Sequence, residues 1–218
     1  MNSLTSIVFD LDGTLIDSAP DLRAAINHSL AALSRKPLDL PTIVSFVGNG
    51  VEALVERSLV ATGGCDPTLH KDTLRLFLRA YEADNATLTQ IYPGVEARLQ
   101  SLNAQGFKLG ICTNKPERPA REICRNLGLD KYFRAIHGAQ KGRTRKPDPS
   151  PLRECITTLG GVSEQALYVG DSKVDYDTAR NAGVRFALFT GGYLNDPLNG
   201  PDPFLTFGNW TEDWLACL

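Results

Sequence analysis

Acidic residues end two short apolar runs of this sequence. Asp10 and Asp12 close the first run, and Asp171 closes a later one, with Asp175 one helical turn beyond it. Two carboxylates about 4 Å apart repel each other by roughly 4 kcal/mol at an effective dielectric near 20. A cluster of this kind is stable only with a bound cation, with protonation, or beside a lysine. Because no soft ligand accompanies these oxygens, a hard ion such as Mg²⁺ is the cation that fits.

A lysine beside such a cation would make a place for a dianionic phosphoryl group. Lys146 lies in a loop after one apolar run, and Thr113 and Asn114 end another. The ion and Lys146 would neutralise the phosphoryl oxygens, while the Thr113 hydroxyl would donate a hydrogen bond to them. One carboxylate can attack phosphorus in line, and another can protonate the leaving oxygen and then take a proton from water. These residue types therefore predict phosphoryl-transfer chemistry.

The elements that would position these residues are strands alternating with helices. Short β-branched and aromatic runs predict strands, and the segments between them have helical periodicity. This alternation favours an α/β fold with a doubly wound parallel sheet, a Rossmann-like core, in which ligands lie at the carboxyl ends of the strands. The predicted strands are Ser6–Leu11, Lys108–Thr113, Arg134–His137, Ala166–Val169 and Arg185–Phe189; the predicted helices are Val95–Gln105, Pro119–Leu127, Ser150–Leu159 and Val174–Ala182.

One long segment after the first strand breaks the alternation. Residues 17–89 are helical throughout in pattern, which predicts a helical cap domain inserted into an α/β hydrolase core formed by residues 1–16 and 90–218. The expected helices are Ser18–Leu33, Val51–Ala61 and Thr68–Asp84, with hinges near Leu15–Asp17 and Thr89–Pro93. Ser18 and Asp21 have the spacing of a capping box, and Gly63-Gly64 predicts a helix end. Near the C-terminus, Phe204–Phe207 predicts a short edge strand and Trp210–Leu218 a closing helix.

Composition excludes several classes of protein. With 218 residues, 42% of them hydrophobic, the chain is long enough to bury a core. A net charge of −2 with mixed signs argues against a nucleic-acid partner, and no run approaches the ~20 apolar residues that span a bilayer. Five scattered cysteines favour neither disulfides nor zinc. We expect a cytoplasmic protein, monomeric or homodimeric, that binds a small phosphorylated metabolite and neither nucleic acid nor membrane.

Four motifs, in order, resemble those of the haloacid dehalogenase-like hydrolases. They are Phe9-Asp10-Leu11-Asp12-Gly13-Thr14-Leu15, Cys112-Thr113-Asn114-Lys115, Lys146-Pro147-Asp148-Pro149 and Val169-Gly170-Asp171-Ser172-Lys173-Val174-Asp175. The resemblance implies that Asp10 is the nucleophile and Asp12 the general acid–base. It implies a phosphate site at Thr113, Asn114 and Lys146. It also implies Mg²⁺ held by Asp10, the backbone carbonyl of Asp12 and Asp171, with Asp175 in or near the coordination shell.

Within that superfamily the chain is similar to phosphoglycolate phosphatases. Three segments resemble the corresponding segments of those enzymes: Asp17-Ser18-Ala19-Pro20-Asp21-Leu22, Phe46-Val47-Gly48-Asn49-Gly50 and Gly191-Gly192-Tyr193. The resemblance implies 2-phosphoglycolate or a similar small acid as substrate, and it makes Gly48, Asn49 and Gly50 of the cap candidates for substrate specificity. The basic run Lys141–Arg145 has no counterpart in the resemblance. It would bind a second anionic group or form a solvated loop.

Three other functions stay open on the sequence. A sugar-phosphate phosphatase or a β-phosphoglucomutase-like phosphotransferase would use the same scaffold, the mutase returning the phosphoryl group to a second hydroxyl. A phospho-acceptor signalling domain also gathers acidic residues, a threonine and a lysine, but in another order and without a helical insertion after its first strand. A binding protein that has lost catalysis is disfavoured because every catalytic position is filled.

Overall fold

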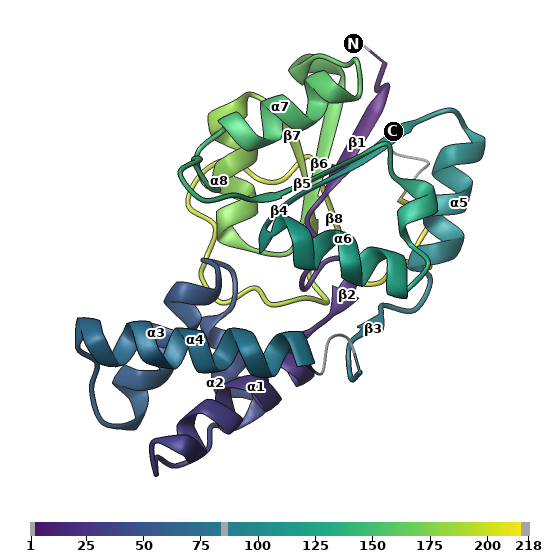
Figure 1. Cartoon of the computed structure of the whole chain (residues 1–218). Coiled ribbons are helices and arrows are strands. Elements are labelled where there is room, and N and C mark those ends of the chain that lie inside the picture. Colours follow the sequence, from purple (N-terminus) through teal and green to yellow (C-terminus); the bar gives the residue numbers. More distant parts are fainter. Residues whose placement is uncertain (1–2, 84–86, 215–218) are drawn as a thin grey trace. The chain divides into compact units, whose positions relative to one another are not determined.

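The computed structural model describes residues 3–83 and 87–214, and its centre is a parallel sheet. In this part of the chain six strands lie in the order β5-β4-β1-β6-β7-β8, and every recorded pairing between them is parallel. The strands are β1 Ser6–Phe9, β4 Lys108–Pro116, β5 Ala135–Ala139, β6 Ala166–Gly170, β7 Arg185–Phe189 and β8 Leu205–Phe207. The predicted α/β class and parallel sheet are confirmed (Figure 1).

Helices cover both faces of this sheet. Val8 of β1 and Tyr168 of β6 belong to the apolar cluster under α7 (Ser150–Thr158) and α8 (Lys173–Ala182). Phe9, the next residue along β1, points to the other face, where its ring contacts Phe133 and Trp210. That face is covered by α5 (Val95–Ala104), α6 (Glu117–Asn126) and the short helix η1 (Asp130–Tyr132). Burial on both faces explains why these strands are continuous apolar runs in the sequence.

The chain forms two compact units, Met1–Asp17 with Ile91–Leu218, and Ser18–Gln90. The second unit, in purple and blue in Figure 1, consists of α1 (Ala19–Ala32), α2 (Leu40–Phe46), α3 (Val51–Thr62) and α4 (Pro67–Ala83). Ile26, Ile43, Leu59 and Phe77 are fully buried within it. The chain leaves and re-enters the core unit through two short paired strands, β2 (Ile16–Asp17) and β3 (Gln90–Ile91). That the helical unit acts as a cap stays a prediction.

Three local predictions were wrong or incomplete. Helix α2 was missed because it has only seven residues; the Asp39 carboxylate caps it by accepting a hydrogen bond from the Thr42 amide. Ser18 makes no capping bond, because its expected partner Asp21 accepts bonds from the Leu88 and Thr89 amides instead. The predicted closing helix is a turn at residues 210–211 followed by a bend at 212, and its last four positions, 215–218, lie outside the described residues.

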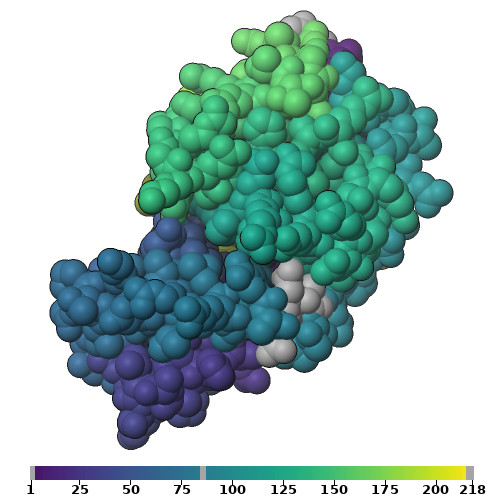
Figure 2. All heavy atoms as spheres, in the orientation of Figure 1, coloured from purple at the N-terminus to yellow at the C-terminus, as the bar shows by residue number. Residues whose placement is uncertain are grey.

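No helix in the described ranges is both long enough and apolar enough to cross a bilayer. In the space-filling view the visible face of the core unit is formed mainly by the teal and green middle part of the chain (Figure 2). Asp10 directly follows β1 and Asp171 directly follows β6, at the carboxyl ends of the strands, which is where an open α/β sheet binds ligands.

Candidate active site

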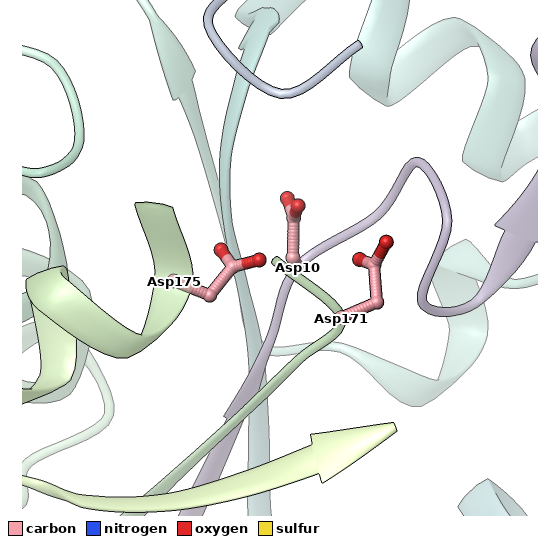
Figure 3. A group of neighbouring side chains, drawn as sticks. All are labelled: Asp10, Asp171 and Asp175. Atoms are coloured by element: carbon pink, nitrogen blue, oxygen red, sulfur yellow. The ribbon is translucent and has the colours of Figure 1, made fainter. Parts of the chain in front are cut away.

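Three aspartates meet at the carboxyl ends of β1 and β6. Asp10 follows β1 directly, Asp171 follows β6, and Asp175 lies in the first turn of α8. Each offers a carboxylate oxygen, and these oxygens lie within 4.8 Å of one another (Figure 3). The Asp10 amide donates to the Val169 carbonyl over 2.9 Å, which fixes Asp10 against the end of β6. The parallel pairing of two central strands therefore brings together carboxylates that are about 160 positions apart in the sequence.

The Asp10 carboxylate is buried beside a lysine. Burial raises the pKa of Asp10 to about 6, against the lowering effects of the Lys146 ammonium and a hydrogen bond with Thr113. Lys146 Nζ lies 3.0 Å from Asp10 Oδ1. That oxygen is nevertheless buried without a well-formed hydrogen bond among the described residues. A buried carboxylate oxygen that lacks a well-formed hydrogen bond is one that an additional cation would contact.

Neutral groups orient the Asp171 carboxylate. The Thr14 hydroxyl donates to Oδ1 over 2.6 Å, and the Tyr193 amide donates to Oδ2 over 2.7 Å. Burial raises the pKa of Asp171 well above its ordinary value, and the neighbouring carboxylates Asp175 and Asp10 raise it further. The backbone comes so close that a Cβ on Gly13 would lie 2.3 Å from Asp171 Oδ2. The Asp12-Gly13-Thr14 turn thus requires glycine at its centre, where φ is +85°.

Asp175 has a different set of partners. Its Oδ1 lies 2.6 Å from Lys146 Nζ and 2.9 Å from the Tyr168 hydroxyl. Its Oδ2 accepts bonds from the Ser172 hydroxyl and amide, completing a capping box at the start of α8. Asp175 therefore both pairs with the active-site lysine and begins a helix.

Lys146 is fixed through its backbone as well as its ammonium group. Asn114 accepts a hydrogen bond from the Lys146 amide at 3.0 Å and donates to the Lys146 carbonyl at 3.1 Å. Burial alone would lower the pKa of Lys146, but Asp10 and Asp175 outweigh it and hold that pKa above its usual value. Lys146 stays charged. Asn114 uses its amide to hold Lys146, so its predicted contact with phosphate stays a prediction, while the structure gives it a positioning role.

Asp12 stands apart from the close group of three. Its carboxylate pairs with Lys115, whose Nζ lies 3.0 Å from Oδ1 and 3.3 Å from Oδ2. The side chain of Asp12 is 15% exposed, whereas that of Lys115 is 4% exposed. The Asp12 side chain is thus slightly more exposed than that of Asp10, which is 11% exposed, so a bound molecule can reach both carboxylates.

The donor set fits a hard divalent cation. Asp10, Asp171 and Asp175 present only oxygen ligands, and no cysteine or histidine joins this group. When all of them are ionised, these three and Asp12 carry four negative charges against the two ammonium groups of Lys115 and Lys146. The two remaining negative charges are what one divalent ion would balance.

Sequence reasoning did not assign a role to Lys115, Tyr168 or Tyr193. Lys115 and Tyr193 belong to motifs that the sequence shows, but the motifs do not reveal which side chains these residues contact. Nothing in the sequence distinguishes Tyr168 from a core residue, because aromatic side chains are common in buried strands. Its hydroxyl lies 2.9 Å from Lys146 Nζ, a contact that depends on how β4 and β6 flank β1.

Two predicted binding segments lie outside this group. Gly48, Asn49 and Gly50 link α2 to α3 in the helical unit; Gly50 precedes α3 with a φ of +87°, and Asn49 is exposed. Their part in substrate specificity stays a prediction. The basic run at residues 141–145 is exposed, and Arg143 pairs with Glu154 on α7 over 3.2 Å.

Known proteins resemble this chain in sequence and in fold. Residues 7–189 match the family model described as haloacid dehalogenase-like hydrolase. A phosphoglycolate phosphatase of Cereibacter sphaeroides is 48% identical over 198 residues, covering 90% of this chain and 89% of that protein. One of Rhodospirillum rubrum is 39% identical, covering 97% and 90%. The crystal structure of a predicted phosphoglycolate phosphatase from Haemophilus somnus superposes with a TM-score of 0.88 at 30% identity, covering 96% of each chain.

Proposed function

Because the chain belongs to the haloacid dehalogenase-like hydrolase family, we propose that it hydrolyses a small phosphomonoester, 2-phosphoglycolate, through an aspartyl-phosphate on Asp10. The observation that carries this proposal is the Asp10 carboxylate. It is buried at the end of β1, 3.0 Å from Lys146 Nζ and within the group of Asp10, Asp171 and Asp175. These positions support the proposal, because they would bring a nucleophile, a cation for the phosphoryl oxygens and metal ligands close together.

In the first step an Asp10 oxygen attacks phosphorus and the bond from phosphorus to the ester oxygen breaks. Asp12 gives its proton to the departing alkoxide, so that an alcohol leaves. In the second step Asp12 takes a proton from water, whose oxygen attacks phosphorus. The bond between phosphorus and Asp10 then breaks, releasing inorganic phosphate and returning both carboxyl groups to their starting state.

The surrounding groups stabilise charge in both steps. Lys146 neutralises a phosphoryl oxygen, and its position is fixed by Asp175, by Tyr168 and by the Asn114 clamp on its backbone. The Thr113 hydroxyl donates to a second oxygen. A Mg²⁺ ion held by Asp10, Asp171 and the Asp12 carbonyl would supply the charge stabilisation that the phosphoryl group needs. The Lys146, Tyr168 and Ser172 contacts of Asp175 favour support of Lys146 over direct metal ligation.

The experiment that tests this function is phosphate release by the purified chain. With Mg²⁺, 2-phosphoglycolate should be hydrolysed faster than glucose 1-phosphate and other sugar phosphates, and EDTA should stop the reaction until Mg²⁺ is restored. Asp10→Asn should lose at least ~10³ in turnover while folding normally, because the amide cannot form the acyl phosphate. Asp202→Asn, an exposed loop position, is the control. Turnover by Asp10→Asn, or full activity without metal, would contradict the proposal.

A further inference from the structure

Two basic side chains are buried among the described residues, and both belong to the active site. They are Lys115 and Lys146, which are 6% and 5% exposed. Lys146 has a clear task, because it contacts Asp10, Asp175 and Tyr168. Lys115 lies on the other side of the site, against Asp12. Burying an ammonium group is unfavourable by several kcal/mol unless its partners compensate, so a second buried lysine calls for a reason.

The backbone of β4 fixes the position of Lys115 beside Asp12. The pairing of β4 with β5 changes register between Cys112 and Pro116, so the residues between them leave the regular ladder. The Lys115 amide donates to the Thr113 hydroxyl over 3.2 Å, which ties it to a predicted phosphate ligand. A Cβ on Gly138 of β5 would lie 2.8 Å from the Lys115 carbonyl. The segment is thus held on both sides, and its ammonium group is directed at Asp12.

The distance from Lys115 to a bound ester can be estimated. This estimate rests on the proposed function, because it takes Asp12 as the acid that protonates the leaving group. To protonate the leaving oxygen, Asp12 must lie about 3 Å from it. Lys115 Nζ lies 3.0 Å from Asp12 Oδ1, so it lies within roughly 6 Å of that oxygen. In 2-phosphoglycolate the carboxylate oxygens are three bonds, about 3 Å, from the ester oxygen. A carboxylate on the leaving group can therefore reach hydrogen-bond distance of Lys115 when it extends from the ester oxygen toward Nζ.

We propose that Lys115 is a specificity-determining residue that binds the carboxylate of the leaving group. The substrate class would be phosphate esters of short 2-hydroxy acids, in which an anionic group follows the ester oxygen by one carbon. The ammonium group has three donors, so it can bind a carboxylate while it stays paired with Asp12. The exposed run at 141–145 is the competing source of positive charge, and Arg143 in it already pairs with Glu154.

A pair of esters that differ only in this charge tests the proposal. In 2-hydroxyethyl phosphate a neutral hydroxymethyl group replaces the carboxylate of 2-phosphoglycolate. The measured quantity is the ratio of kcat/KM for the two esters with Mg²⁺. A hydrogen bond between charged groups is worth about 10- to 100-fold, so the unchanged enzyme should prefer the acid by that factor. Lys115→Met should bring the ratio near one, and Lys115→Arg should keep most of the preference.

The ratio separates this role from the alternatives. Lys141→Met, in the exposed basic run, should leave the preference unchanged; if it abolishes the preference, the run binds the carboxylate and Lys115 does not. If Lys115→Met slows both esters equally, Lys115 supports only Asp12 or the phosphate and the proposal is wrong. Should Lys115→Met fail to fold, Lys115→Gln and Lys115→Arg give the same comparison. An enzyme that hydrolyses both esters equally well overturns this inference while leaving the phosphatase assignment intact; hydrolysis of neither overturns both.

Discussion

Asp171 and Asp175 lie four residues apart on either side of Asp10, yet their surroundings differ in kind. Asp175 is paired with the Lys146 ammonium at 2.6 Å and begins helix α8. Among the described residues, the recorded donors to Asp171 are both neutral, the Thr14 hydroxyl and the Tyr193 amide. Burial raises the pKa of Asp171 well above its ordinary value. One carboxylate therefore has its countercharge within the chain, and the other does not.

This difference indicates separate tasks for the two acids. A carboxylate whose oxygens are oriented by neutral donors, with no cation of its own, is ready to bind an external ion. A carboxylate that is already neutralised by a buried lysine contributes to the folded structure and to the placement of that lysine. The two acids of a single motif would then serve metal binding and stability separately.

The strongest test of this difference replaces each of the two acids, in separate variants, with the corresponding amide. Asp175→Asn should lower the free energy of unfolding by about 3 kcal/mol, because it removes the nearer of the buried carboxylates, Asp175 and Asp10, that pair with Lys146. Asp171→Asn should not lower the metal-free stability, because it removes repulsion from Asp10 and Asp175. It should instead weaken the apparent affinity for Mg²⁺ by at least ~10-fold. Urea unfolding and titration calorimetry with Mg²⁺ measure the two effects.

Asp177→Asn is the matched control for both variants. Asp177 lies on the same helix, two residues after Asp175, where it pairs with Lys173 and is partly exposed. Its loss should change stability by less than ~1 kcal/mol. Equal loss of Mg²⁺ affinity in Asp171→Asn and Asp175→Asn would remove the distinction between the two acids and make Asp175 a direct ligand.

The metal-free protein should also show an unusual dependence of stability on pH. Asp10 has a pKa of about 6 in the folded chain against 3.8 as the ordinary value, because burial, Asp175 and Asp12 outweigh Lys146 and Thr113. The folded state thus binds more protons than the unfolded state between these values. The Asp10 contribution to the free energy of unfolding therefore falls, by about 3 kcal/mol in total, as pH rises from below 4 to above 6.

The contribution of Asp10 is isolated by comparison with Asp10→Asn, which cannot titrate. With EDTA present, urea unfolding should give the two proteins similar stability near pH 4 and the variant the greater stability near pH 7. Excess Mg²⁺ should reduce or reverse that difference, because the ion stabilises the folded state with Asp10 ionised. A difference that does not change with pH would mean that Asp10 keeps an ordinary pKa in the folded chain.

The predictions from sequence succeeded for features that depend on the order of residue types along the chain, such as apolar strands and the acids that end them. Asp10 and Asp171 were predicted together because acids at the ends of parallel strands must meet at one edge of a sheet. Every strand of the sheet was also predicted to within a few residues, since strands buried on both faces are continuous apolar runs. The two boundaries of the helical insertion, placed at 16/17 and 89/90, lie one residue from the division of the chain into its two units.

The sequence was uninformative where a role depends on side-chain partners. The spacing of Ser18 and Asp21 predicted a capping box, but the Leu88 and Thr89 amides, nearly seventy positions away, bind Asp21 instead. The same limit hid the Tyr168 contact with Lys146 and the Lys115 contact with Asp12. These contacts are set by the packing of elements that are distant in sequence, and no local pattern encodes them.

A residue of the C-terminal segment helps to hold one of the uncharged groups that orient Asp171. Trp210 is buried in an aromatic cluster against Phe9 and Phe207, and its indole N–H donates to the Thr14 carbonyl over 3.1 Å. Thr14 in turn donates its hydroxyl to Asp171. Trp214 belongs to the same cluster and is equally buried, but its indole N–H has no partner among the described residues. Trp210 therefore holds the loop that orients Asp171, whereas Trp214 only packs.

The smallest expected effect comes from the paired variants Trp210→Phe and Trp214→Phe. Both lose the same volume from one cluster, so both should lower the melting temperature, Trp210→Phe by more because the Thr14 carbonyl also loses its donor. Only Trp210→Phe should also lower kcat, by roughly 3- to 10-fold, because a small displacement of Thr14 misplaces Asp171. Measured at saturating substrate, the loss should shrink as Mg²⁺ is raised, since a higher concentration compensates for a weaker metal site. If the two variants lose activity in proportion to stability alone, the aromatic cluster is structural core and Asp171 is oriented by Thr14 and Tyr193 without it.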